Sequence, residues 1–273
     1  MRIAILASEG APYIKSGGLG DVMEALPAAL SRMDGNEVVL ILPYYKKIRE
    51  NPKYRVEFIK QLYVSLGWRQ QYCGIHSLKK DGVTYYFIDN EYYFKRGGAY
   101  GYYDDGERFA FFDRAILEAI LRMEDFEPDI IHCNDWQTGP LCAYLKEIYS
   151  HMMPYSKIKT LYTIHNLQYQ GRFAPSTLDM MGLPGWTWNN VEFYDSVSFM
   201  KMGLVYCDYI STVSETYAYE IQTPEYGYGM EGILRSRAHR LKGIVNGIDF
   251  VANNPATDKH IVKHFDAKHP EGK

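Results

Sequence analysis

The chain has few cysteines, no long apolar run and no excess of positive charge. Only four of its 273 residues are cysteine, and no two of them form a Cys-x-x-Cys pair, which favours reduced thiols in a cytoplasm over a disulfide framework. The first apolar run covers about five residues, far fewer than a signal-peptide core or a membrane span needs. The net charge of −3 gives no support for binding to nucleic acid or to an anionic membrane.

The composition also lacks internal repeats and low-complexity tracts, and it fits one soluble domain with a large core. The unusual feature is tyrosine, of which there are 25. An aromatic ring with one polar end suits stacking on a sugar and hydrogen bonding to it. A general bias in composition is the competing explanation, so tyrosine content alone does not identify a sugar-binding protein.

The most informative segment is the glycine-rich loop at residues 15–22, which reads KSGGLGDV. It follows a short apolar run typical of a buried strand and precedes residues 22–33, whose apolar spacing predicts a helix. The start of a helix offers free backbone N–H groups and a positive dipole end to an anion such as a phosphate. The segment therefore predicts a phosphate site at Lys15, Gly17 and Gly18, unless the glycines serve only the turn.

The loop departs from both common nucleotide-binding fingerprints. A dinucleotide loop reads G-x-G-x-x-G, whereas the glycines here are spaced G-G-x-G. A P-loop places its lysine after the glycines, whereas Lys15 comes before them. Asp21 fits the N-cap of the predicted helix, and Glu24, three residues later, completes a capping-box pattern.

Strands and helices alternate along most of the chain. Strands are predicted at residues 3–7, 38–42, 130–133, 160–164, 209–213 and 243–245, and helices at 22–33, 107–123, 138–149, 197–206, 215–222 and 232–238. Residues 55–89 differ, because they hold three short strand-like runs and an Asp81-Gly82 turn, which is a strong hairpin signal. The pattern predicts an α/β fold, namely a doubly wound, Rossmann-like parallel sheet with an antiparallel hairpin insertion. From residue 250 onward the chain is polar, and we expect a loosely held linker.

Polar residues follow four of the predicted strands. Lys15, Asp135, His165 and Asn246 each come shortly after a strand ends. In a doubly wound sheet, ligands bind beyond the carboxyl ends of the strands. We therefore expect these four residues to meet at one edge of the sheet.

Structural explanations compete with functional ones at two of these positions. Asp135 is placed to act as the N-cap of the helix that follows it, and a histidine after a buried strand is more often structural than catalytic. The segment from His132 to Asp135 also contains several types of metal ligand. A zinc site needs a second ligand cluster, and adjacent strand residues such as His132 and Cys133 point to opposite faces, so we expect no metal.

Six segments resemble the bacterial glycogen synthases and plant starch synthases, and they follow the order of that family. They are residues 15–22 (KSGGLGDV), 132–137 (HCNDWQ), 163–171 (TIHNLQYQG), 212–218 (TVSETYA), 228–232 (YGMEG) and 243–249 (GIVNGID). Each segment is short, but together they span nearly the whole chain. The resemblance implies a retaining glucosyltransferase that moves glucose from ADP-glucose to the non-reducing end of an α-1,4-glucan.

Members of this family have two Rossmann-like domains that face each other across a cleft, which is the GT-B arrangement. The resemblance implies that residues 1–249 are the N-terminal, acceptor-side domain and that residues 250–273 lead into a C-terminal nucleotide-sugar domain that this chain lacks. We therefore expect the chain alone to have little or no transferase activity. The alternative is a non-catalytic module of the same fold that binds an α-glucan or a nucleotide.

The resemblance also implies roles for individual residues. His165 and Asp135 are the expected catalytic residues, with the backbone carbonyl of His165 facing the anomeric centre and Asp135 lying near the transferring glucose. The remaining expected site residues are Lys15, Gly17, Gly18 and Asn246 for the donor and its phosphates, and Asp21, Tyr100 and Asn166 for the acceptor side of the cleft, with Tyr102 and Tyr103 as alternatives to Tyr100.

No pair of carboxylates suited to a double displacement is visible in the sequence. The resemblance instead implies front-face attack, in which the departing phosphate takes the proton of the acceptor. Glu231 is interpreted as a first-turn acid of the predicted helix beside it and not as a catalytic group. The expected partners are ADP-glucose, an α-1,4-glucan and the C-terminal domain, and neither a cofactor nor a metal is expected.

Overall fold

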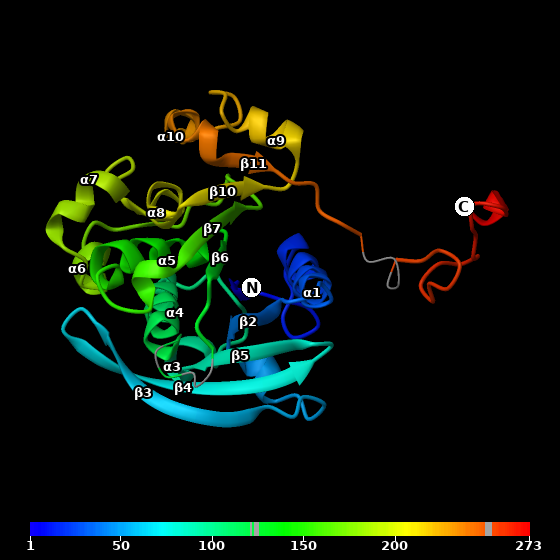
Figure 1. Cartoon of the computed structure of the whole chain (residues 1–273), viewed down its shortest axis with the longest axis horizontal. Helices are drawn as coiled ribbons and strands as arrows, with labels where there is room; N and C mark the ends of the chain where they lie inside the picture. The colour runs from blue at the N-terminus through cyan, green and yellow to red at the C-terminus, as the bar shows by residue number, and fades with distance from the viewer. Residues whose placement is uncertain (121, 123–125, 249–252) are drawn as a thin grey trace.

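The fold is built on one large sheet. The computed structural model describes residues 1–120, 122, 126–248 and 253–273, and within them the sheet has nine strands in the order β11-β10-β7-β6-β1-β2-β5-β4-β3 (Figure 1). These strands are β1 (Arg2–Leu6), β2 (Glu37–Pro43), β3 (Glu57–Leu66), β4 (Arg69–Lys80), β5 (Val83–Asp89), β6 (Ile130–Asn134), β7 (Lys159–Ile164), β10 (Tyr209–Thr212) and β11 (Leu241–Gly243). Neighbouring strands from β11 to β5 are parallel, and β4 runs antiparallel to both β5 and β3.

Helices cover both faces of this sheet. The α-helices are α1 (Gly18–Ser31), α2 (Lys46–Arg49), α3 (Glu91–Phe94), α4 (Asp105–Ile120), α5 (Gly139–Tyr144), α6 (Thr177–Met181), α7 (Trp188–Val191), α8 (Phe199–Tyr206), α9 (Glu215–Glu220) and α10 (Glu231–Ser236). In Figure 1, α1 lies on one side of the sheet and α4, α5 and α8 lie on the other. Because both faces are covered, a central strand such as β2 is buried from Val38 to Pro43 and reads as one apolar run.

Short elements complete the fold. They are the 3₁₀ turns η1 (Trp136–Thr138), η3 (Tyr155–Lys157), η4 (Gly185–Thr187), η5 (Ala238–Arg240) and η6 (Pro270–Gly272), the π-helical turn η2 (Leu145–Tyr149), and a small ladder of β8 (Arg172–Phe173) with β9 (Val197–Ser198). The predicted doubly wound α/β fold is confirmed.

The strand order reverses beside β1. From β1 the chain moves to β2 and β5 on one side, and it later continues through β6, β7, β10 and β11 on the other side. Ligands of doubly wound sheets bind outside the carboxyl ends of the strands at such a reversal. The topology therefore places the loops that follow β1, β6 and β7 next to one another.

The predicted hairpin insertion is present but longer than the sequence indicated. Asp81 and Gly82 join β4 to β5 with φ values of 52° and 79°, as a tight hairpin turn requires. β3 has 10 residues and β4 has 12, so the strands extend well beyond their apolar runs. Backbone pairing continues through polar positions such as Glu57 and Lys79, which side-chain alternation does not reveal.

The predicted capping box at the start of α1 is wrong. The helix begins at Gly18 with Gly17 as its N-cap, and no side chain caps it. Asp21 therefore lies inside the first turn, where its negative charge still favours the helix dipole. Gly20 allows close packing in this turn, because a Cβ there would lie 2.9 Å from the side chain of Lys15.

Several other predicted boundaries also shift. The predicted helix at residues 138–149 is divided into η1, α5 and η2, and Pro140 stands in the first turn of α5. Residues 197–198 form β9, which pairs with β8. The helix α8 begins only after Ser198, whose side chain accepts a hydrogen bond from the backbone N–H of Lys201. β11 ends at Gly243 rather than beginning there. The predicted helix end at Met123 and the predicted domain boundary between Asp249 and Phe250 lie outside the described residues.

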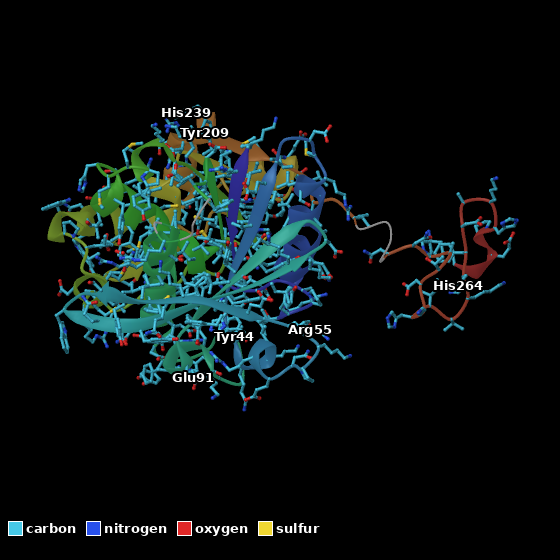
Figure 2. The ribbon with its side chains drawn as sticks, turned by 60° about the horizontal axis from the view of Figure 1, so that its bottom comes forward. Tyr44, Arg55, Glu91, Tyr209, His239 and His264 are labelled. Atoms are coloured by element: carbon cyan, nitrogen blue, oxygen red, sulfur yellow. The ribbon has the colours of Figure 1, made fainter. Side chains whose placement is uncertain are left out.

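Residues 253–273 stand apart from the sheet in Figure 1, and His264 lies away from the body of the molecule in Figure 2, whereas Tyr44 and Glu91 lie on it. The only helical element within residues 253–273 is the three-residue turn η6. No helix in the described part of the chain is both long enough and apolar enough to cross a membrane.

Close packing of α8 on β7 leads to a testable prediction. A Cβ at Gly203 in α8 would lie well under 3.0 Å from the ring of Tyr162, which is fully buried. We expect Gly203→Ala to lower the free energy of unfolding by about 1 to 3 kcal/mol, measured by urea denaturation. Gly232→Ala in α10 is the matched control, because its Cβ would meet nothing within 4 Å and should be neutral or slightly stabilising. Equal stabilities of the two variants would contradict the close contact.

Candidate functional site

The glycine-rich loop follows β1 and presents Lys15 at the surface. The Lys15 side chain is 50% exposed, and its Nζ lies 2.7 Å from Oδ1 of Asp21. Gly17 and Gly18 are exposed, and a Cβ at Gly18 would meet nothing within 4 Å. The surface around Gly17, Gly18 and Lys15 is therefore open at the start of α1, where a helix offers free N–H groups.

Glu9 is an organising residue of this loop that the sequence analysis missed. It is 4% exposed, and its Oε2 accepts hydrogen bonds from the backbone N–H and the hydroxyl of Ser16 and from the N–H of Gly17, the last at 3.3 Å. The carboxylate thus occupies the first backbone donors of the loop. An anion placed here must use the later N–H groups and Lys15.

A prediction about loop stability follows from Glu9. Glu9→Ala leaves three loop donors without their acceptor, so we expect a loss of about 1 to 3 kcal/mol in unfolding free energy. Urea denaturation measures this loss. Glu50→Ala is the control, because Glu50 forms only an exposed ion pair, at 3.9 Å from Lys46, and should cost less than about 1 kcal/mol. A Glu9→Ala variant as stable as Glu50→Ala would show that Glu9 does not hold the loop.

Asp135 follows β6 in an unusual backbone conformation. Its φ is 58° and its ψ is −177°, a region that costs a non-glycine residue roughly 1 to 3 kcal/mol. Its Oδ1 accepts hydrogen bonds from the backbone N–H of His165 at 2.8 Å and of Asn166 at 3.4 Å. Although Asp135 occupies the N-cap position of η1, its side chain makes no capping bond. The carboxyl group instead links the end of β6 to the loop after β7.

His165 follows β7 and is tied to β6 by its side chain as well. Its Nε2 lies 2.9 Å from Oδ1 of Asn134, and Asn134 is fully buried. Asn166, the next residue, has an exposed side chain. Its Oδ1 accepts a hydrogen bond from the backbone N–H of Gln168 at 3.0 Å. The structure thus brings Asp135, His165 and Asn166 together in one cluster.

Burial controls the ionisation of this cluster. It raises the pKa of Asp135 to about 7, against the two backbone hydrogen bonds, which lower it. Burial lowers the pKa of His165 to about 4 and the pKa of His132 to about 3, where the neighbouring His165 adds a smaller effect. At neutral pH both imidazoles are therefore uncharged, so they offer hydrogen-bonding groups and no positive charge to the cluster.

Tyr100 is the tyrosine that reaches the glycine-rich loop. Its hydroxyl lies 3.2 Å from the Ser16 hydroxyl and 3.5 Å from that of Ser8, and burial raises its pKa. Of the two alternatives, the hydroxyl of Tyr102 accepts a hydrogen bond from the Gly98 N–H, and Tyr103 is 93% exposed. Contact with the loop therefore favours Tyr100.

Two other predicted residues stand outside this cluster. Asn246 is exposed beyond β11, and β11 is separated from β7 by β10. It follows a strand at the carboxyl edge of the sheet, but it makes no hydrogen bond or ion pair with another site residue in the described part of the chain. Glu231 lies in the first turn of α10, as interpreted from the sequence.

His132 and Cys133 point in different directions, as strand alternation requires. The Nε2 of His132 lies 2.6 Å from the hydroxyl of Thr163, whereas the thiol of Cys133 lies 3.8 Å from that of Cys142. Among the residues that the structure describes, no group of three or more His, Cys, Asp or Glu side chains is arranged to hold a metal ion. Within the His132–Asp135 segment, the side chain of His132 thus contacts Thr163, whereas those of Asn134 and Asp135 both contact His165.

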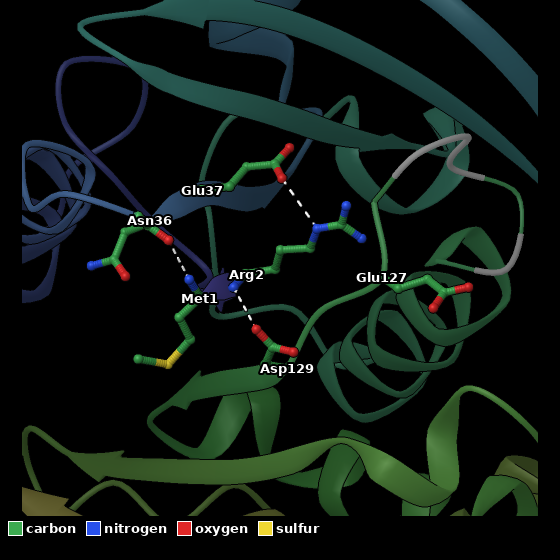
Figure 3. A pocket seen from close by; sticks show the side chains of 7 residues that line it. Met1, Arg2, Asn36, Glu37, Glu127 and Asp129 are labelled. Atoms are coloured by element: carbon green, nitrogen blue, oxygen red, sulfur yellow. Dashed lines mark hydrogen bonds and ion pairs between the residues drawn. The ribbon is translucent and has the colours of Figure 1, made fainter.

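An open hollow lies at the opposite edge of the sheet. It is lined by Met1, Arg2, Gly35, Asn36, Glu37, Glu127 and Asp129 (Figure 3). Three of its residues are engaged with one another, since the Arg2 guanidinium lies 3.3 Å from Glu37 and the backbone N–H of Arg2 donates to Asp129 at 2.7 Å. It is formed at the amino ends of the strands, so we assign it no part in the site.

Known proteins share both the sequence and the fold of this chain. The family model described as the starch synthase catalytic domain matches residues 2–236. A glycogen synthase of Clostridium beijerinckii is 50% identical over all of this chain and 57% of its own length. One of Clostridium acetobutylicum is 51% identical over 98% of this chain and 56% of its own length.

A solved structure extends the match to three dimensions. It is the catalytic domain of starch synthase IV from Arabidopsis thaliana, bound to ADP and acarbose, with a TM-score of 0.88 and 33% identity over 99% of this chain and 56% of that one. The chain thus spans a little over half the length of the relatives it matches. The family match and the shared fold show that the chain belongs to the family of starch synthase catalytic domains.

Proposed function

We propose that this chain is the acceptor-side domain of a retaining glucosyltransferase that transfers glucose from ADP-glucose to the non-reducing end of an α-1,4-glucan. The observation that carries the proposal is the convergence of Lys15, Asp135 and His165 on adjacent loops at the carboxyl ends of β1, β6 and β7. The relatives named glycogen synthase support the reaction. The ADP in the starch synthase IV structure supports the donor.

In this proposal the cluster binds and polarises the substrates. The bond from the anomeric carbon to the diphosphate breaks, and a bond from that carbon to the acceptor hydroxyl forms on the same face of the sugar. The proton of the acceptor passes to the departing phosphate oxygen. Lys15 stabilises the negative charge that develops on the diphosphate, and the Asp135–His165 link holds the His165 backbone carbonyl toward the sugar.

The acceptor side of the cleft is assigned to Tyr100, Asn166 and Asp21. The hydroxyl of Tyr100 stands at the glycine-rich loop, and the side chain of Asn166 is exposed beside Asp135. Asn246 is assigned to the donor. We further propose that a second domain, matching the part of the relatives that this chain does not cover, completes the nucleotide-sugar pocket. Residues 250–273 would connect to it.

The test compares this chain with the chain completed by its natural continuation. Incorporation of ADP-[¹⁴C]glucose into glycogen should be readily measured for the completed protein and close to background for the 273 residues alone. UDP-[¹⁴C]glucose serves as the second donor. Sustained glucan extension by the chain alone would contradict its assignment as half of a site.

A non-catalytic module of the same fold is the alternative. In that case the completed protein would fold but transfer glucose from neither donor. Calorimetric titration with maltooligosaccharide and with ADP would then identify which ligand the module binds. The exposed Lys15 loop favours the transferase over a module that binds only α-glucan, because such a module has no need of a cation at a helix start.

A further inference from the structure

Asn134 connects the strand ends that carry the proposed site. It is the last residue of β6 and is fully buried. Its Nδ2 donates to two backbone carbonyls. One is that of Leu6, the last residue of β1, at 3.0 Å, and the other is that of His132, two residues earlier, at 3.3 Å. Its Oδ1 faces the imidazole of His165 after β7. One side chain therefore contacts the carboxyl ends of β1, β6 and β7.

Only one orientation of the Asn134 side-chain amide satisfies its hydrogen-bond partners. Both groups on its Nδ2 side are carbonyl oxygens, which accept hydrogen bonds but never donate them. Turning the amide over would place Oδ1 against these two oxygens and leave buried groups unsatisfied. Oδ1 is therefore the atom that lies 2.9 Å from Nε2 of His165, and it acts there as an acceptor.

This acceptor determines the proton position on His165. A hydrogen bond to Oδ1 requires a proton on Nε2. Burial lowers the pKa of His165 to about 4, so near neutral pH the ring carries a single proton. Nδ1 is then unprotonated. Among the described residues Nδ1 has no hydrogen-bond partner, and it is not one of the buried polar atoms that lack one, so it reaches the surface of the site.

We propose that Asn134 is a positioning residue that holds His165 in the tautomer with its proton on Nε2 and thereby makes Nδ1 an acceptor for a ligand hydroxyl. An unprotonated ring nitrogen attracts a hydroxyl donor and repels a phosphate oxygen. The two residues therefore take different ligand groups. His165 accepts a hydrogen bond from a sugar hydroxyl, and Lys15 binds phosphate. The ligand contact rests on the proposed function, whereas the tautomer of His165 does not.

His132 offers an internal comparison. Its Nε2 faces the hydroxyl of Thr163, which in turn lies 2.6 Å from the hydroxyl of Ser211. A hydroxyl can donate or accept, so this chain of groups leaves the His132 tautomer free to change. The two histidines therefore differ in whether a neighbouring side chain fixes the position of the ring proton, which is the effect that we assign to Asn134 at His165.

Nitrogen NMR of the chain labelled with [¹⁵N]histidine tests this proposal. His165→Gln identifies the His165 signals among the eight histidines. At neutral pH we expect wild-type His165 to show a protonated Nε2 and an unprotonated Nδ1, with no second form. Asn134→Leu, which removes the acceptor, should move the Nδ1 signal toward the protonated range as the other tautomer becomes populated.

Thr163→Val is the matched control, because it also removes a buried polar partner but faces His132. It should alter the His132 signals and leave those of His165 unchanged. A wild-type His165 protonated on Nδ1, or an Asn134→Leu variant with unchanged His165 signals, would overturn the proposal. If circular dichroism shows that Asn134→Leu is unfolded, Asn134→Ala replaces it, and the wild-type spectrum alone still decides the tautomer. No substrate is present, so failure of transferase activity does not affect this result.

Discussion

Lys15→Ala in the completed protein is expected to lower the rate of glucose transfer from ADP-glucose about 100- to 1,000-fold, the usual effect of removing one group that stabilises developing negative charge. The Lys15 side chain lies near the start of α1, where a Cβ added at Gly18 would have no neighbouring atom within 4 Å. Its ion pair with Asp21 is exposed on both sides, so stability should change by less than about 1 kcal/mol. ADP-[¹⁴C]glucose incorporation and urea denaturation measure the two effects.

Lys95→Ala is the control for this prediction. Lys95 forms a comparable exposed ion pair, 3.0 Å from Glu91, in α3. Its removal should leave transfer unchanged, because it lies outside the site. Transfer by a folded Lys15→Ala protein at the wild-type rate would mean that the glycine-rich loop binds no diphosphate. Equal losses in both variants would point to a general effect of surface charge.

The sequence identifies much of the candidate site because its parts lie in short contiguous segments. Lys15 with its glycines, Asp135 and His165 each follow a recognisable apolar strand, and parallel strands end at a common edge. The structure joins Asp135 to His165 at that edge and presents Lys15 on the loop that follows β1. The same reasoning applied to Asn246 is less informative, because β11 is a three-residue strand at the end of the sheet.

Residues that act through distant partners could not be found in this way. Glu9 precedes the glycine-rich loop, and in the sequence it cannot be told from a surface glutamate. Its hydrogen bonds with Ser16 and Gly17 form only in the folded chain. Asn134 acts on Leu6 and His165, and the first of these is 128 residues away. Such roles depend on tertiary contacts, and local spacing carries no information about them.

The sequence predicts too late a start for α1, and here too tertiary contacts are the reason. Three glycines within four residues argue against a helix on propensity alone, and the first helical apolar repeat begins at Val22. Tertiary contacts override this preference, since the Ala11 N–H donates to the carbonyl of Gly20 at 2.9 Å. The early start bears on the proposed phosphate site, because it brings the N–H groups of the helix close to the open surface beside Lys15.

The second large effect is expected for Asp135→Ala. The variant leaves the backbone N–H groups of His165 and Asn166 without their acceptor and keeps an unfavourable φ near 58°. We expect a loss of about 1 to 3 kcal/mol in unfolding free energy. Transfer by the completed protein should fall about 100-fold, because a small displacement of His165 misaligns the reacting groups. Wild-type transfer by Asp135→Ala would show that this link does not position His165.

Asp135→Asn separates the positioning role from the charge. It retains an acceptor at Oδ1 but does not titrate. Burial raises the pKa of Asp135 from 3.8 to about 7 in the folded protein, so between these values the folded state binds more protons than the unfolded state at this residue. The stability that the protonated group contributes is full below pH 3.8 and is lost as the pH rises toward 7. Relative to wild type, Asp135→Asn should therefore gain about 2 to 3 kcal/mol between pH 5 and pH 7.5.

Comparison of the two proteins isolates this effect from the histidines. The lowered pKa values of His165 and His132 act in the opposite sense, because their neutral folded forms lose stability as the pH falls from 6.5 toward 4. Both proteins carry these histidines, so the difference in unfolding free energy, measured by urea denaturation at each pH, cancels them. A difference that stays constant from pH 5 to pH 7.5 would mean that Asp135 is ionised throughout this range. In that case its carboxylate would act in the site as a negative charge rather than as a neutral hydrogen-bonding group.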